Sequence, residues 1–203
     1  LSISRPGLLD LVLDTPISPD QQAIKAALGD LGVDRLKAIM TVHSLYDHAM
    51  DTGIVALETS AQVLGSLSTA NAARGAGVPD SQITEVLYDR DYAFGKFRIR
   101  FYESQHAPLV NDGPPMPGFI SDPLVPPQPV SAWREGGSYS IVIEHPRGSL
   151  LIQGSAGFVT GALSEVKVDA VFLGAGGLSQ LSTDHVSSYI HEIVDRKSTR
   201  LNS

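Results

Sequence analysis

In the stretch LKAIMTVHSLYDH, residues 36–48, an apolar run is followed by a polar segment, and this pattern decides the fold and the site. Residues 36–42 form a short apolar run, which predicts a buried strand. The polar segment after it places His43, Asp47 and His48 within six residues. A rigid sheet aims side chains on a loop at its edge, and imidazole with carboxylate suits zinc or another divalent transition metal. We therefore predict a metal site at His43, Asp47 and His48.

Helical patterns lie on both sides of this stretch. Upstream, Ser18 is a suitable N-cap, Pro19 suits the first helical position, and Gln21 completes a capping box. A helix is therefore expected to begin there and to end near Gly32. Downstream, the spacing of apolar residues predicts a helix, a short strand and a second helix, at residues 54–58, 62–65 and 69–74.

The second half of the chain has the pattern of paired strands. Residues 96–103 start in clean alternation of apolar and polar side chains, as in a half-buried strand, and lead to His106. Two further runs, 138–144 and 149–153, are separated by a short turn and predict a hairpin. One more strand and one more helix are then predicted, at residues 168–173 and after a cap at Asp184.

A long loop is predicted between the paired strands. Residues 107–133 contain eight of the 13 prolines of the chain, and loops of this length are usually functional or disordered. Outside that loop, strands and helices alternate, with antiparallel pairs included. This order predicts an α/β layered fold rather than a helical bundle or an all-β sandwich.

Composition excludes several classes of protein. The formal net charge is −7 and no basic stripe offers phosphate contacts, so no nucleic-acid partner is expected. The chain has no cysteine, which excludes disulfides, thiolate zinc sites and cysteine nucleophiles. No run of about 18 apolar residues is present, so no membrane span is expected. The compartment, cytoplasmic or periplasmic, stays open because both contain cysteine-free proteins.

Both ends of the sequence are expected to be incomplete. The chain begins at Leu1 rather than at methionine, which suggests that an N-terminal portion is missing. Residues 195–203 read DRKSTRLNS, which matches the translation of a common sequencing adapter. We expect this tail to be an artefact and exclude it from the fold. One partial domain is therefore predicted over residues 1–194.

The segment from His43 to His48 resembles the H-x-H-x-D-H motif of the metallo-β-lactamase-fold hydrolases. Its spacing and its preceding strand fit, but Leu45 stands where the family has the second histidine. His106 follows the next strong strand, where the family places a further histidine ligand. Ser155 stands at a strand end where many members carry a bridging aspartate. The resemblance covers most of residues 30–180 and is closest to uncharacterised bacterial hydrolases related to lactonases and to phospholipase-D-type N-acylethanolamine enzymes.

This resemblance implies a fold, a cofactor and a reaction. The fold would be the αβ/βα four-layer sandwich, incomplete at both ends, with one or two zinc ions. His43 and His106 would bind the first ion, and Asp47 and His48 the second, with Asp47 also the catalytic residue. The reaction would be attack of a metal-bound hydroxide on an ester, lactone, amide or phosphodiester of a small-molecule substrate.

Other interpretations of the same residues stay open at this stage. Leu45 supplies no lone pair, which favours a non-catalytic or weakly active relative with a degraded metal site. A sequencing error at codon 45 would also explain it, since one nucleotide separates some leucine and histidine codons. Two histidines and one aspartate also occur on ordinary solvated loops. A serine hydrolase using Ser155 is disfavoured, because the G-x-S-x-G elbow needs glycine where Gln153 stands.

Overall fold

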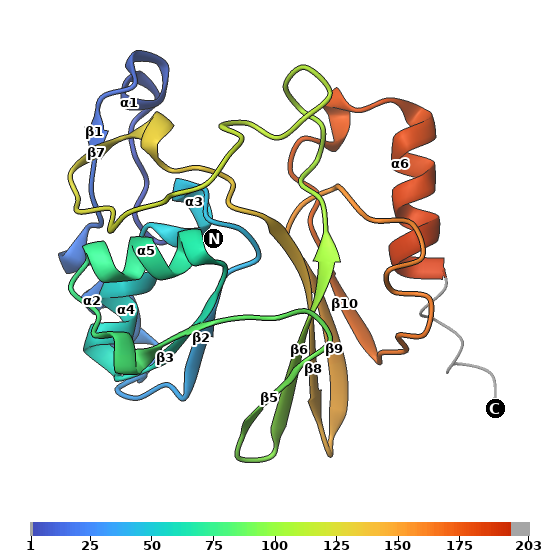
Figure 1. Cartoon of the computed structure of the whole chain (residues 1–203), viewed down its shortest axis with the longest axis horizontal. Helices are drawn as coiled ribbons and strands as arrows, with labels where there is room; N and C mark the ends of the chain where they lie inside the picture. The colour runs from blue at the N-terminus through green and yellow to red at the C-terminus, as the bar shows by residue number, and fades with distance from the viewer. Residues whose placement is uncertain (1, 196–203) are drawn as a thin grey trace. The chain divides into compact units, whose positions relative to one another are not determined.

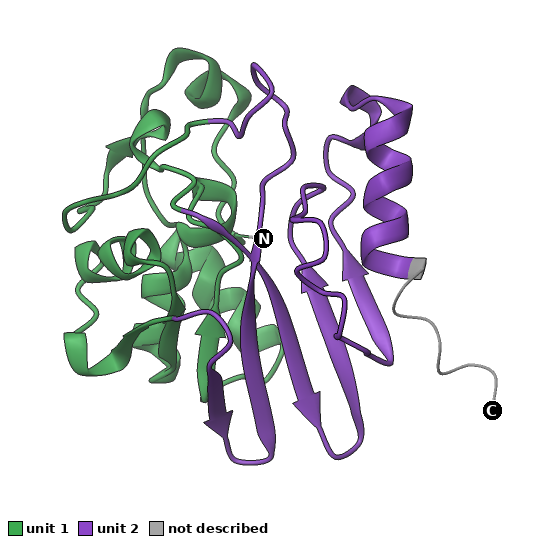
Figure 2. Ribbon diagram, turned by 45° about the vertical axis from the view of Figure 1, so that its right-hand side comes forward, with its two compact units in different colours: residues 1–86, 116–136 green, residues 87–115, 137–203 purple. Residues whose placement is uncertain are grey.

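The computed structural model describes residues 2–195 (Figure 1). The chain divides into two compact units (Figure 2). Unit 1 comprises Leu1–Val86 and Met116–Gly136, and unit 2 comprises Leu87–Pro115 and Gly137–Ser203. The mixture of helices with parallel and antiparallel strands confirms the α/β class. Of the predicted artefactual tail, residues 196–203 lie outside the described residues.

Unit 1 is built on a parallel three-stranded sheet. Its strands are β2 (Ala38–Met40), β3 (Gln62–Gly65) and β4 (Ile83–Glu85), in the order β2-β3-β4. A two-stranded antiparallel ribbon joins β1 (Pro16–Ile17) to β7 (Gln128–Pro129). The helices of the unit are α1 (Leu8–Leu13), α2 (Gln21–Asp30), α3 (Tyr46–Ala49), α4 (Thr52–Thr59) and α5 (Leu67–Gly75).

Small apolar side chains let the helices of unit 1 approach the sheet closely. Ala56 of α4 and Ala73 of α5 pack with Val63 of β3 in one buried cluster. Ile24 of α2 packs with Ile54 of α4 in another. The helices predicted at 54–58 and 69–74 and the strand predicted at 62–65 are confirmed, with the helices starting two residues earlier.

Unit 2 contains a five-stranded sheet of order β10-β9-β8-β6-β5. The strands are β5 (Asp91–Phe94), β6 (Phe97–Ser104), β8 (Ser138–His145), β9 (Gly148–Gln153) and β10 (Ala170–Leu173). The β8–β9 hairpin predicted from the sequence is confirmed, with Ile141 opposite Ile152. Helix α6 (Thr183–Ile190) continues into one turn of π-helix, His191–Asp195. Tyr189 and Ile193 of this helical segment pack with Val142 and Leu151 of the sheet in one core.

The first predicted helix start is wrong by two residues. Helix α2 begins at Gln21, because Asp20 rather than Ser18 is the N-cap. The Asp20 carboxylate accepts hydrogen bonds from the backbone N–H groups of Gln22 and Ala23 at 3.1 and 3.0 Å. This satisfies two of the donors that every helix leaves unpaired at its start.

The cap of the last helix is also different from the prediction. Ser182 caps α6 by accepting the N–H of His185 at 3.2 Å, and Asp184 lies in the first turn. Asp184 there still favours the helix, since an acidic side chain near the positive end of the helix dipole is stabilising. The prediction placed the helix correctly and chose the wrong capping residue.

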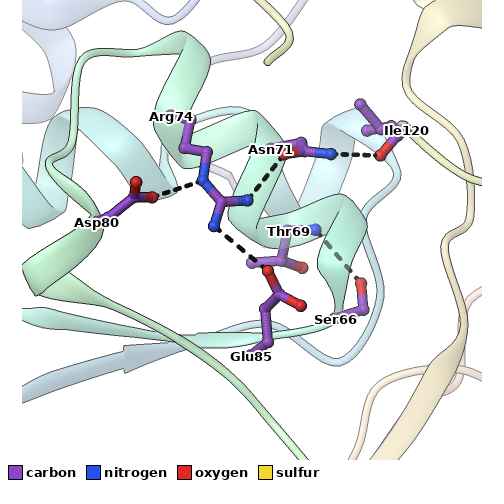
Figure 3. A network of polar contacts seen from close by, with 7 residues as sticks. All are labelled: Ser66, Thr69, Asn71, Arg74, Asp80, Glu85 and Ile120. Carbon is purple, nitrogen blue, oxygen red and sulfur yellow. Dashed lines mark hydrogen bonds and ion pairs between the residues drawn. The ribbon is translucent and has the colours of Figure 1, made fainter. Parts of the chain in front are cut away.

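The proline-rich segment is largely irregular, as predicted, but its later part is anchored to α5. Asn71 of α5 donates from Nδ2 to the Ile120 carbonyl at 2.8 Å (Figure 3). The Asn71 Oδ1 accepts from Arg74 Nη1 at 2.8 Å. The same guanidinium contacts Asp80 and Glu85. One end of this network is buried at Asn71, while Asp80 is mostly exposed.

The buried end of this network is predicted to carry most of its stability. The Asn71→Ala variant is expected to lower the free energy of unfolding by about 1–3 kcal/mol, because the Ile120 carbonyl loses its side-chain donor. The Asp80→Ala control breaks an exposed ion pair and should cost less than about 1 kcal/mol. Urea denaturation of the two variants checks this, and equal losses would contradict it.

Candidate metal-binding loop and histidine loop

The predicted ligands of the 43–48 segment lie at the carboxyl edge of the parallel sheet. Strands β2, β3 and β4 run in one direction, so the loops after them leave from the same edge. His43 comes three residues after the end of β2, and Asp47 and His48 lie on the short helix α3. Loops at this edge are the usual position of ligand sites in open α/β sheets.

Neighbouring segments hold the backbone of this loop. The Thr41 and Thr69 hydroxyl oxygens are 2.6 Å apart and buried, which ties the loop to α5. The Ser44 N–H donates to the Glu135 carbonyl at 2.9 Å. The Ser44 hydroxyl donates to the Arg134 carbonyl at 2.8 Å. The loop therefore has fixed anchors directly before and after His43.

Gly136 is required by this packing. Its φ of +70° lies in the left-handed region, which side chains rarely adopt. A Cβ at this position would overlap the Ser44 hydroxyl and the Ser68 side chain. The segment that anchors Ser44 can therefore approach the loop only because residue 136 has no side chain.

Three of the four predicted metal ligands are brought together. The rings of His43 and His48 have centroids 4.0 Å apart and are tilted by 53°. His48 Nε2 lies 3.6 Å from Asp47 Oδ2. His43 is 1% exposed, whereas the Asp47 side chain is 45% exposed, so the group extends from the interior to the surface.

The spacing of Asp47 and His48 fits two ligands of one ion. Two atoms bound to a tetrahedral zinc ion at about 2.0–2.1 Å lie about 3.3 Å from each other. The observed 3.6 Å between His48 Nε2 and Asp47 Oδ2 is close to that value. Among residues 2–195, no group of three or more His, Asp or Glu side chains is arranged to hold a metal ion. The positive structural support for a metal is therefore the Asp47–His48 pair.

Leu45 is an interior residue of the loop. It is 2% exposed and is the N-cap residue of α3, where its side chain makes no capping hydrogen bond. An apolar side chain thus occupies the position between His43 and Asp47. It contributes burial to the fold and no ligand atom to the loop.

A hollow beside Asp47 was not predicted from the sequence. Its volume is about 320 Å³, and its lining includes Arg5, Leu11, Tyr46 and Asp47. Burial raises the pKa of the Tyr46 hydroxyl above its ordinary value, and the nearby Asp47 carboxylate raises it further. Tyr46 is therefore neutral and able to donate a hydrogen bond at neutral pH. No periodic pattern links residues 5 and 46, so only the fold reveals this hollow.

The N-terminal segment, which lines this hollow with Ser2 and Ser4, is anchored at Asp51. The Ser4 N–H donates to Asp51 Oδ2 at 2.8 Å, and Asp51 is 5% exposed. The Ser2 hydroxyl donates to the Tyr46 carbonyl at 3.0 Å. Asp51 therefore acts as an anchor that brings the start of the described chain against α3.

His106, the fourth predicted ligand, belongs to unit 2. It follows β6 and is half-buried. Its Nδ1–H donates to the carbonyl of Ala107 at 2.9 Å, so the neutral ring has its lone pair on Nε2. Metal-bound histidines commonly donate their other ring N–H to a backbone carbonyl in this way. Nε2 is therefore the ring nitrogen through which a neutral His106 could bind a metal ion.

Ser155, which a serine hydrolase would use as its nucleophile, makes a structural contact. Ser155 Oγ accepts a hydrogen bond from the Ala107 N–H at 2.9 Å and is 8% exposed. His185 lies on α6 in the same unit and donates from Nε2 to the Ala156 carbonyl at 2.7 Å. The Ser155 side chain thus holds the backbone of Ala107 and the His185 side chain that of Ala156, which argues against a serine-hydrolase site.

Comparisons with known proteins do not assign the chain to a family. No family model matches the chain, and no curated protein matches it. One solved structure that it resembles is a motif mutant of a metallo-beta-lactamase from Cronobacter sakazakii. That match has a TM-score of 0.47 and 13% identity, and covers 83% of this chain and 77% of that chain. Among residues 2–195, no helix is long and apolar enough to cross a membrane.

Proposed function

We propose that this chain is a metal-dependent hydrolase, with zinc as the most suitable ion, and that it belongs to the metallo-β-lactamase αβ/βα sandwich class. The observation that carries the proposal is the Asp47–His48 pair, with the His43 ring beside His48, on a loop at the carboxyl edge of a parallel sheet. The 3.6 Å between His48 Nε2 and Asp47 Oδ2 supports these two as ligands. His106 is proposed as a further ligand on the sequence motif and on its Nδ1–H donation.

The roles of the residues follow from their chemistry. A bound divalent ion would lower the pKa of a water molecule towards about 7 and polarise a carbonyl or phosphoryl group. His43 and His48 would bind as neutral imidazoles, and the Asp47 carboxylate would add a negative charge that favours the cation. Asp47 is also exposed enough to accept a proton from water, the catalytic role proposed for it. Proposed substrates are small esters, lactones, amides or phosphodiesters.

Metal content tests this proposal directly. Wild-type protein dialysed against micromolar zinc and then desalted is expected to retain about one equivalent of zinc. The Asp47→Asn and His48→Ala variants should lose most of it, because each removes a ligand of the closest pair. The His145→Ala variant is the control, since His145 packs against Phe97 at the end of the unit 2 sheet opposite Ser104 and the loop of His106. Wild-type protein without retained zinc would refute the metal site.

A second proposal is favoured by Leu45. Its complete burial where a ligand histidine would stand fits a non-catalytic or weakly active relative that retains the fold. The two proposals differ in turnover. A hydrolase cleaves at least one ester, lactone or phosphodiester when zinc is supplied, and loses that activity with a chelator. The non-catalytic relative binds zinc weakly and cleaves none of them.

A further inference from the structure

We infer that Ser155 and Gln153 are positioning residues for His106, holding its loop so that the imidazole keeps one orientation. The inference rests on the proposed function only in giving His106 a metal to bind. The contacts that carry it lie entirely within unit 2. They involve a serine and a glutamine that the proposed reaction leaves without a role.

The sheet of unit 2 brings the two segments to one edge. Strands β6 and β9 are both antiparallel to β8, so they run in the same direction. Their carboxyl ends, Ser104 and Gln153, therefore lie at the same edge of the sheet. The loop carrying His106 leaves from the first end, and the segment 153–157 leaves from the second.

Gln153 links these segments through a buried amide. It is 2% exposed, and its Oε1 accepts a hydrogen bond from the Ser140 hydroxyl. Its Nε2 donates to the Ser104 hydroxyl at 3.0 Å and to the Gly157 carbonyl at 2.7 Å. A third acceptor, the Ser155 carbonyl, lies 3.1 Å from the same nitrogen. One amide therefore fixes the end of β6 to the turn after β9.

Ser155 acts one step closer to the histidine. Its Oγ accepts the Ala107 N–H, while the Ala107 carbonyl accepts the Nδ1–H of His106. Both backbone polar groups of the buried Ala107 are thus engaged, one by each side chain. The Ala107 N–H and carbonyl belong to adjacent peptide groups, so the Ser155 hydroxyl restrains the residue whose carbonyl orients the imidazole. The same carbonyl also accepts the Leu109 N–H at 2.9 Å.

Gly157 shows how closely the two segments pack. A Cβ at this position would overlap the carbonyl groups of Gln105 and His106. The backbone on both sides of the imidazole therefore lies directly on the turn after β9. With contacts from Gln153, Ser155 and Gly157, the loop has an anchor on each side of His106.

Ser155 variants separate positioning from general stability. Ser155→Ala removes the acceptor of the Ala107 N–H and is expected to weaken zinc binding about 10–100-fold, the usual effect of losing a partner that orients a ligand. Ser155→Thr keeps the hydroxyl and should stay within about threefold of wild type. Ser149→Ala is the matched control, since the Ser149 hydroxyl bonds to Asp169 at the opposite end of β9. It should leave zinc affinity unchanged.

A second measurement needs no metal. The ¹⁵N chemical shifts of the His106 ring in metal-free protein report which nitrogen is protonated. Wild type and Ser155→Thr are expected to show the Nδ1–H tautomer alone, and Ser155→Ala a mixture of tautomers. If Ser155→Ala does not fold, Ser155→Cys, with its weaker acceptor, takes its place and should give an intermediate shift.

The outcomes distinguish this inference from the proposed function. Zinc binding that Ser155→Ala does not weaken overturns the inference, and so does an unchanged His106 tautomer in that variant. Wild-type protein that binds no zinc overturns the proposed function instead. The positioning role is then decided by the ring spectrum, where a mixed tautomer in Ser155→Ala supports it.

Discussion

The Leu45→His variant is expected to bind zinc at least about tenfold more tightly than the wild-type chain, because it adds a ligand atom to the loop. Leu45 lies between His43 and Asp47 and is 2% exposed, so the new imidazole would be directed inward. Competition with a chromophoric chelator measures the affinity. Without zinc the variant should be less stable by about 1–3 kcal/mol, since a polar ring is buried in place of an apolar side chain.

The matched control for this gain is Leu45→Gln. Glutamine buries a polar group of similar size at the same position and should cost similar stability without zinc. It should not raise the affinity, because a neutral amide is a poor zinc ligand. A Leu45→His variant that binds zinc no better than Leu45→Gln would show that position 45 does not face the ion. The loop would then have to be assigned another role.

The Gly75→Ala variant is expected to lose about 1–3 kcal/mol of unfolding free energy or more, although alanine is the better helix former. Gly75 is the last residue of α5, and a Cβ there would overlap the backbone of Leu124. The Leu124 N–H also donates to the Asn71 carbonyl at 3.0 Å, which keeps this segment against the helix. No change of side-chain rotamer relieves an overlap with backbone, so the 116–136 segment would have to move.

Gly29→Ala provides the opposite result in the same protein. Gly29 is near the end of α2, and a Cβ there meets no atom within 4 Å. This variant should gain about 0.5–1 kcal/mol, because alanine lowers the entropy of the unfolded chain and favours the helix. Urea denaturation of both variants gives the comparison. A stabilised Gly75→Ala variant would mean that the 116–136 segment does not rest on α5 in solution.

The elements of this fold could be predicted where their signals are local. The bounds of β3 follow from a short apolar run, and β6 follows from alternation that places Ile99 and Phe101 in the interior. The caps were less predictable, because Ser18 and Asp20 are both good capping residues two positions apart. In the structure Asp20 is the N-cap, and its carboxylate accepts hydrogen bonds from two backbone N–H groups.

In the candidate site too, residues close in sequence could be predicted to lie together, and residues far apart in sequence could not. His43, Asp47 and His48 lie within a segment of six residues, so a turn after β2 is enough to bring them together. That Arg5 and Asp47 line the same hollow could not be predicted, because more than 40 residues separate them and no sequence pattern joins them. The hydrogen bond from the Ala107 N–H to Ser155 Oγ, which holds the loop of His106, could not be predicted for the same reason, since the two residues are 48 positions apart.

The sequence alone determined the α/β class, the order of most of the strands and helices, and the grouping of histidine and aspartate after β2. These depend on hydrophobic periodicity and on short spacing, which act within about one turn or one strand. Only the tertiary structure shows what surrounds the predicted ligands. Ser44 is anchored to the carbonyl of residue 135, and Leu45 is buried. Hydrogen bonds from Gln153 and Ser155 hold the loop of His106. Such contacts join segments far apart in the chain, and they exist only after the sheets have brought the strand ends together.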